Sequence, residues 1–304
     1  MITDNKIQTI PTSESGTTDT TTFLEQKLEQ EMFDNKGCDF HMHSYLSDGV
    51  NSIEHLIDKA RKNGLKKIAI TDHDMTYSYE LAKEILAKNE ITDLIVIPGV
   101  EISTDDYHIL GLNIDPHNES LEEVLHINRE FCIARSEIMC KNLKNAGYDI
   151  SFDKVHNLHP NTKRLGKFHI ADYLAKFETG RIKKENGNDI SIQNVIKSYL
   201  KKGKVGYVNS MNIFSNQAIP AIHNAGGIAV LAHPSLDVKE MSEIDSLVKI
   251  GLDGIEMQPN YSAKDYLPFY NYAKAKGLVI THGSDFHRDD MNKPILSYNT
   301  NCRR

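Results

Sequence analysis

The sequence predicts an α/β protein in which a mainly helical insertion interrupts a parallel sheet or barrel. Short apolar runs alternate with amphipathic segments over residues 38–112, and the alternation resumes after residue 218. Residues 119–218, between these two stretches, have the apolar spacing of helices. With 304 residues, 39% hydrophobic and 25% charged, the chain has the composition of an ordinary soluble globular protein.

Residues 1–34 are expected to be a disordered or loosely docked extension. They contain "TIPTSESGTTDTTT", a Ser/Thr/Asp-rich run without apolar periodicity. The following "TFLEQKLEQEMF" has apolar residues near helical spacing, so a short docking helix is expected there.

The first half of the α/β domain alternates strand and helix. Ser52 is the expected N-cap of the first helix, and Gly64 lies just past its end. The expected elements, in order, are a strand at 37–43 ("GCDFHMH"), a helix at 52–64, a strand at 65–74 ("LKKIAITDHD"), a helix at 78–89, a strand at 92–104 ("TDLIVIPGVEIST") and a strand at 106–114 ("DYHILGLNI").

The second half begins with one long helix over residues 120–147, and the segment up to about residue 215 is expected to be mainly helical. The alternation then resumes with a helix at 218–227, a strand at 228–234 ("IAVLAHP"), a helix at 241–251, a strand at 252–259 ("LDGIEMQP"), a helix at 266–277 and a strand at 278–287 ("LVITHGSDFH").

Charge is unevenly distributed along the chain. The net charge is −7, which argues against a non-specific nucleic-acid binder. Residues 119–218 contain 16 Lys+Arg and 11 Asp+Glu, a net charge of +5, and the remainder has 19 and 31, a net charge of −12. A basic insert on an acidic body fits a metal site beside a surface that meets anions, although a solvated helical face would show the same charge.

The expected environment is the reducing cytoplasm. Four scattered cysteines form no CxxC pair, no apolar run approaches the ~20 residues needed to cross a bilayer, and the N-terminus has no signal-peptide core. We therefore expect no membrane partner.

Metal-ligand side chains occur at the ends of several predicted strands. Parallel strands of a barrel place their carboxyl ends on one face, so these side chains are expected to meet there. One histidine after an apolar run is weak evidence, but five or six strand ends with such a residue indicate a metal site. Nitrogen and oxygen ligands without thiolate suit Zn²⁺, Mn²⁺ or Fe²⁺. The residues at strand ends are His41, His43, His73, Glu101, His233, Asp285 and His287, and His108 lies on the strand at 106–114.

The chain resembles the PHP family, named for polymerase and histidinol phosphatase. The matching motifs are "DFHMHSYLSDG", "AITDHD", "IPGVEIS", "YHILGL", "AVLAHP" and "GSDFH", in the family's order, over residues 38–112 and 220–287. The resemblance implies a distorted (β/α)7 barrel formed by residues 35–118 and 219–304, with residues 119–218 as a helical insertion that acts as a phosphate lid. It also implies a site for two to three divalent ions of Mn, Fe or Zn.

The resemblance also assigns the ligands. One ion would be held by His41, His43, Glu101 and Asp285. Glu101 would bridge to a second ion, held also by His108 and His233, and the third would be held by Asp48, His73 and His287. Glu101, His73 and Asp285 are the expected catalytic residues, around a hydroxide that bridges two ions and attacks phosphorus.

The insertion resembles that of stand-alone PHP phosphoesterases, which include 3′,5′-bisphosphonucleotide phosphatases and 5′-to-3′ exoribonucleases. Its "ARSEIMCKNLKNAG" matches a helix with a phosphate-binding arginine, here Arg135. Its "LGKFHIADYL" resembles a "GRPHIA"-type segment, which gives Lys167 and His169. Lys167 stands where that pattern has an arginine and lacks the bidentate fork, for which Arg164 is the expected compensation.

The expected function is hydrolysis of a nucleotide 3′,5′-bisphosphate or a short 5′-phosphorylated oligonucleotide. The alternatives are a phosphatase of a non-nucleotide metabolite and, ranked lower, a non-catalytic metal-binding domain or a C–N amidohydrolase. A stable duplex nucleic-acid partner is not expected, and the oligomeric state stays open. Asp72 and Asp74 are interpreted as supporting or turn residues, and Glu256 as core-edge structure.

Overall fold

The computed structural model of the chain describes residues 37–178, 190–258, 263–289 and 295. These residues belong to one compact unit, residues 37–304. The extension predicted for residues 1–34 and its short helix lie outside the described residues. Within the described part, no helix is both long and apolar enough to cross a bilayer.

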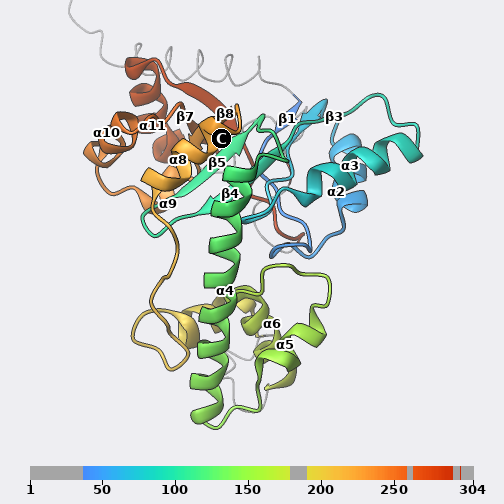
Figure 1. The fold of residues 1–304 in the computed structure, drawn as a ribbon, viewed down its shortest axis with the longest axis vertical. Coiled ribbons are helices and arrows are strands. Elements are labelled where there is room, and N and C mark those ends of the chain that lie inside the picture. Colours follow the sequence, from blue (N-terminus) through green and yellow to red (C-terminus); the bar gives the residue numbers. More distant parts are fainter. Residues whose placement is uncertain (1–36, 179–189, 259–262, 290–294, 296–304) are drawn as a thin grey trace, which may run out of the picture. The chain divides into compact units, whose positions relative to one another are not determined.

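A small parallel sheet forms the first part of the domain (Figure 1). Its strand order is β1-β2-β3, and helices α2 and α3 make the two crossover connections. The Ser52 side chain accepts a hydrogen bond from the backbone N–H of His55, which confirms the predicted N-cap of α2. The elements are β1 (Cys38–Asp39), α2 (Ile53–Lys62), β2 (Lys67–Ile68), α3 (Tyr77–Lys88) and β3 (Ile95–Val96).

A second, mixed sheet follows in the order β4-β5-β6-β7-β8. Strand β5 pairs antiparallel with both β4 and β6, whereas β6, β7 and β8 are parallel. The prediction of an all-parallel sheet was therefore wrong at β5, because a loop of only four residues, 104–107, permits a hairpin but no crossover. The strands are β4 (Gly99–Ser103), β5 (His108–Leu112), β6 (Ile228–Leu231), β7 (Gly254–Met257) and β8 (Val279–His282).

The two sheets are joined by isolated bridges at their edges. Met42 pairs with Phe286, and His73 pairs with Glu101. The strands are thus two adjoining sheets and not one continuous barrel, so the α/β class is confirmed while the closed seven-stranded barrel stays a prediction. Helices α8 (Ser215–Asn224), α9 (Pro234–Asp237), α10 (Met241–Lys249) and α11 (Ala263–Lys276) alternate with β6, β7 and β8.

The described part of residues 119–218 is mainly helical, as predicted. The long helix α4 (Glu119–Asn145) runs from β4 and β5 to α5 and α6 (Figure 1). A separate apolar core, which includes Met139, Leu143, Ile170 and Leu174, holds these helices together. The other elements are α5 (Phe152–Leu158), α6 (Lys167–Phe177), α7 (Ile192–Val195) and the π-helix η1 (Ile196–Leu200).

The segment before α6 is tied to the strand-end loops of the first sheet. The Thr162 hydroxyl donates to the carbonyl oxygens of Leu46 and Ser47, at 3.1 and 2.9 Å. The Arg164 guanidinium donates to the Asp74 carboxylate at 2.6 Å. These bonds place the first turn of α6 beside the carboxyl ends of the strands.

Candidate active site

The structure brings all nine residues predicted as metal ligands into one cluster, in which Asp48, His108 and His287 are partly exposed and the other six are buried. Three groups place their ligand atoms within 4.8 Å of one another: His43, Asp48, His73 and His287; His41, His43, Glu101 and Asp285; and His73, Glu101 and His108. His233 joins the cluster through Glu101, whose Oε1 lies 3.0 Å from its Nε2. The first two groups reproduce the predicted ligand sets, with His43 added to the Asp48 set.

Glu101 lies at the centre, and each of its carboxylate oxygens faces different imidazoles. Oε2 lies 3.2 Å from His41 Nε2, 3.1 Å from His43 Nε2 and 3.2 Å from His73 Nδ1. Oε1 lies 2.9 Å from His108 Nδ1. A carboxylate with one oxygen toward each of two ligand sets has the geometry needed to bridge two ions.

The surroundings of Glu101 fit a bound cation. Its Oε2 is buried and, among the described residues, has no hydrogen bond of normal geometry. Its distances of 3.1–3.2 Å to the imidazole nitrogens of His41, His43 and His73 match the spacing of neighbouring ligands around a metal with bonds of ~2.0–2.2 Å. The spacing around Glu101 therefore fits the predicted metal ligands.

The carboxylates of the cluster also attract positive charge. Burial raises the pKa of Glu101, but His73 and His41 outweigh burial and hold that pKa well below its usual range. Burial lowers the pKa of His43, but Asp285 and Glu101 outweigh it and raise that pKa to about 9. Divalent cations can take the place of the protons that the carboxylates attract.

Two carboxylates that sequence reasoning did not assign to the site orient its histidines. Glu256 Oε1 lies 2.9 Å from His41 Nδ1, and its Oε2 accepts the His233 backbone N–H at 2.8 Å. Asp237 Oδ2 lies 2.9 Å from His233 Nδ1. Glu256 thus supports the cluster. The sequence feature that could have indicated this role is a charged residue within "GIEM", which forms the fully buried strand β7.

Asp72 and Asp74 hold the loops around His73, in agreement with their interpretation as supporting residues. Asp72 accepts three hydrogen bonds: from the Ser44 backbone N–H at 2.8 Å and from the Ser44 and Ser47 hydroxyls, both at 2.6 Å. These bonds fix the loop that carries Asp48. Asp74 accepts from the Ser103 backbone N–H at 2.9 Å, next to the end of β4.

Tight backbone geometry also shapes the cluster. Asp74, His233 and Asp285 have φ values of 54°, 28° and 53°, in a region that non-glycine residues rarely adopt. Gly283 is required for close approach, because a Cβ there would lie 2.1 Å from Glu256 Oε1 and 2.4 Å from His41 Cβ. The strand ends are therefore strained and closely packed where the ligands converge.

A pocket of about 330 Å³ opens beside the cluster and is lined by Asp48, His73, His108 and His287 together with basic residues of the insertion. Arg135 and Lys167, both predicted to bind phosphate, line it. The Arg135 Nε is buried and has no partner within the described residues, while its Nη1 donates to Ser210 Oγ at 3.4 Å. Loss of surrounding water and the nearby guanidiniums of Arg135 and Arg164 lower the pKa of Lys167.

The other two predicted phosphate ligands are placed differently. Arg164 lines the pocket, but its Nε and Nη2 donate to Asp74 at 2.6 Å and to the Ser103 hydroxyl at 2.9 Å. His169 is absent from the described lining, and its Nδ1 accepts the Gly166 backbone N–H at 3.0 Å. Burial lowers the pKa of His169 to about 4, so the ring is neutral and can accept this bond. Whether His169 meets substrate stays a prediction.

Several pocket residues were not identified from the sequence. They come from the first turn of α6, from α7 and η1, from the segment before α8, and from the residue after "GSDFH". Of these residues, only Arg288 could have been identified from the sequence, because it is a cation directly after the predicted ligand His287 in a strand-end motif. The residues are Phe168, Gln193, Ile196, Ser210, Asn212 and Arg288.

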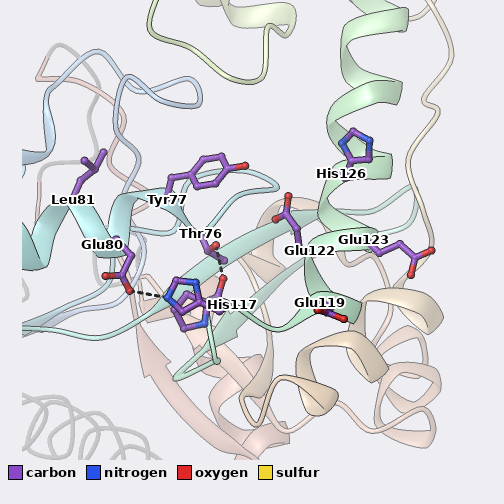
Figure 2. Close-up of a pocket in the computed structure, with 10 residues that line it drawn as sticks. Thr76, Tyr77, Glu80, Leu81, His117, Glu119, Glu122, Glu123 and His126 are labelled. Carbon is purple, nitrogen blue, oxygen red and sulfur yellow. Dashed lines mark hydrogen bonds and ion pairs between the residues drawn. The ribbon is translucent and has the colours of Figure 1, made fainter.

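A larger cavity of about 790 Å³ lies between α3 and the start of α4 (Figure 2). Its lining includes Tyr77, Leu81 and the carboxylates of Glu80, Glu119 and Glu122. It contains none of the clustered metal-ligand groups found within the described residues. An acidic wall repels phosphate, so we assign phosphate chemistry to the smaller pocket.

Comparison with known proteins agrees with this geometry. The PHP domain model matches residues 39–225. The chain is 32% identical to a 5′-3′ exoribonuclease of Salmonella typhimurium over 82% of this chain and 85% of that protein. It is 32% identical to a 3′,5′-nucleoside bisphosphate phosphatase of Chromobacterium violaceum over 82% and 86%. A phosphoribosyl 1,2-cyclic phosphate 1,2-diphosphodiesterase of Eggerthella lenta is 28% identical over 82% and 93%.

Two solved structures are similar. A Chromobacterium violaceum structure, described as an amidohydrolase with bound sulfate and no metal, has a TM-score of 0.74 at 30% identity and covers 85% of this chain and 90% of its own. A Bifidobacterium adolescentis structure, described as a candidate metal-dependent phosphoesterase, has a TM-score of 0.74 at 25% identity, with coverage of 86% and 93%. With the family model matching more than half of its residues, the chain belongs to the PHP domain family.

Proposed function

We propose that this chain is a divalent-metal-dependent phosphoric ester hydrolase acting on a nucleotide 3′,5′-bisphosphate or a short 5′-phosphorylated oligonucleotide. The observation that carries the proposal is Glu101, whose two oxygens face separate imidazole sets beside a pocket lined by Arg135 and Lys167. The activities for which the Salmonella and Chromobacterium relatives are named, each 32% identical, support the reaction class.

Divalent ions in such a site supply a hydroxide nucleophile at neutral pH and neutralise phosphate oxygens. The residues of the chain set the geometry around that chemistry. His41 is oriented by Glu256 and His233 by Asp237, so that the Nε2 of each ring points toward Glu101. His73 and Asp285 are the other proposed catalytic residues, both within the same cluster.

Arg135 and Lys167 provide the second half of the site. The Nε of Arg135, which has no partner in the part of the chain that the structure describes, and the ammonium of Lys167 face a pocket that also contains the proposed ligands Asp48 and His287. A phosphate that does not react at the metals can be held there by charge-assisted hydrogen bonds. The pair thus favours substrates with two phosphate groups.

The test is a panel of phosphate esters assayed with Mn²⁺: adenosine 3′,5′-bisphosphate, adenosine monophosphates, 5′-phosphorylated RNA oligomers and sugar phosphates. Arg135→Ala and Lys167→Ala should each lower kcat/KM for the bisphosphate by roughly ten- to a hundredfold, because each removes a charged hydrogen bond of ~1.5–3 kcal/mol. The monophosphates should be affected less, and metal content should be unchanged.

Lys249→Ala, on the exposed surface of α10, is the matched control for loss of a positive charge. Equal and small losses on mono- and bisphosphates would show that the insertion does not read a second phosphate. A phosphatase of a non-nucleotide metabolite would then be the better assignment.

A further inference from the structure

Phe168 is an aromatic side chain in a pocket that is otherwise mostly polar. Among the described residues that line this pocket, Phe168 and Ile196 have the only hydrocarbon side chains. Phe168 is half-buried and does not belong to the apolar core of the insertion, although Ile170, Ala171 and Leu174 on the same helix do. Its position is therefore explained by the pocket and not by core packing.

The ring of Phe168 is held in place by Arg288, a pocket residue from outside the insertion. The Arg288 guanidinium carbon lies 4.1 Å from the ring centroid, within the range of a cation–π stack. Arg288 is buried and directly follows His287, a residue of the metal-ligand cluster. The stack thus joins the insertion to the strand ends, and the ring needs little ordering when a ligand arrives.

Ile196 adds a second hydrocarbon surface. It is the first residue of the π-helix η1, a helix type that often marks functional sites. Helix α6, whose second residue is Phe168, packs against η1. The hydrocarbon part of the pocket is therefore built from two adjacent helices of the insertion.

The pocket combines a metal-ligand cluster, the cationic groups of Arg135 and Lys167, and this flat aromatic surface. The cluster and the cations can satisfy the anionic part of a substrate. An aromatic ring with an arginine stacked against it is the combination with which proteins hold unpaired nucleobases. The volume of about 330 Å³ is near the lower end of the ~300–1,000 Å³ of small-molecule sites, which suits one nucleotide unit.

We propose that Phe168, held by Arg288 and flanked by Ile196, is a specificity-determining residue that stacks on the nucleobase of the substrate. This inference rests on the proposed phosphoesterase function. It adds that the site distinguishes a nucleotide from a sugar phosphate of the same charge by contact with the base.

The experiment compares adenosine 3′,5′-bisphosphate with the corresponding ribose bisphosphate that lacks the base. Phe168→Leu keeps an apolar side chain but removes the ring, and should lower kcat/KM for the nucleotide roughly five- to a hundredfold, the range for loss of one base–aromatic stack. The value for the abasic bisphosphate should be unchanged. Phe168→Tyr should behave as the wild type, and Arg288→Gln should show a smaller loss confined to the nucleotide.

Phe177→Leu, at an exposed position of the same helix, is the matched control and should leave both substrates unaffected. Dissociation constants provide a second readout in the Mn²⁺-loaded protein: Phe168→Leu should weaken binding of adenosine monophosphate, while binding of inorganic phosphate should be unchanged.

Equal losses on both substrates, or no loss, would overturn the base site. If the wild type hydrolyses both substrates equally well, the phosphoesterase proposal stands and the base site falls. If it hydrolyses neither, the phosphoesterase proposal falls, and the adenosine monophosphate measurement alone decides whether Phe168 stacks on a base.

Discussion

Glu256→Gln tests whether the buried carboxylate behind His41 sets the metal affinity of the cluster. Glu256 accepts hydrogen bonds from two groups: the His41 ring at Nδ1, 2.9 Å away, and the His233 backbone N–H, 2.8 Å away. A glutamine has one acceptor oxygen and one NH₂ group in place of two acceptor oxygens. It can satisfy only one of these contacts and must place its NH₂ against the other donor.

The expected result is a ten- to hundredfold loss of metal affinity, the usual effect of altering a group that orients a ligating histidine. In free energy this is about 1.4–2.7 kcal/mol, which is comparable to the cost of one unsatisfied buried donor. Calorimetric titration of chelator-treated protein with Mn²⁺ measures the affinity, and thermal unfolding of the same metal-free sample measures the fold.

Glu80→Gln, in the larger cavity away from the cluster, is the matched control and should bind Mn²⁺ like the wild type. A folded Glu256→Gln protein with wild-type affinity would refute the role of Glu256 in orienting His41. If the Glu256→Gln protein is unfolded in the absence of metal, the main role of Glu256 is to stabilise the packing of the strands and not to set the metal affinity.

Three further predictions concern the cluster and its support. Glu101→Gln should abolish turnover in a protein with an unchanged circular dichroism spectrum, because one carboxylate faces both ligand sets; a wild-type rate would exclude its bridging role. Reconstituted protein should contain two to three divalent ions by elemental analysis, and chelation should lower the melting temperature since ions stabilise only the folded chain; one ion or fewer would contradict the multinuclear site. Arg164→Met should lower the free energy of unfolding in urea by about 3–5 kcal/mol, because it leaves the buried Asp74 carboxylate without its cation; a loss below 1 kcal/mol would mean that the pair is not needed.

Local sequence patterns predicted the individual elements well. Ser52 caps α2, as predicted, and the strands fall within the apolar runs. The expected strand at residues 92–104 is two strands, β3 and β4, separated by two residues that include Pro98. Its partner β5 runs antiparallel, because the short connection leaves no room for a crossover helix. The direction of a strand and the identity of its partners depend on loop length and long-range contacts. The apolar periodicity of the strand contains no information about either.

Most of the metal cluster was predictable from the sequence because its members follow strand ends, which neighbouring strands bring together, whereas Asp48 came from the family resemblance alone. The role of Glu256 was not predictable, because it depends on the contact between its carboxylate on β7 and the His41 ring. Phe168 and Arg288 could not be paired at all, because they are 120 positions apart and their contact requires the insertion to reach the last strand. Residues that support or shape a site are specified by packing between elements, which leaves little periodic signal in either segment.

Arg164 shows how the insertion and the metal cluster depend on each other. The sequence made it the expected compensation for Lys167, which stands where the family pattern has an arginine. In the structure its Nε and Nη2 donate to Asp74, which follows His73, and to Ser103, the last residue of β4. A guanidinium used in this way positions loops more than it grips phosphate, so Arg135, whose buried Nε has no partner among the described residues, is the better candidate for the predicted phosphate contact. The same ion pair fixes the first turn of α6, and with it Lys167 and Phe168, relative to the strand ends. One buried arginine therefore positions both the proposed substrate-binding residues of the insertion and the predicted metal ligands of the cluster, and a change at Arg164 should disturb both.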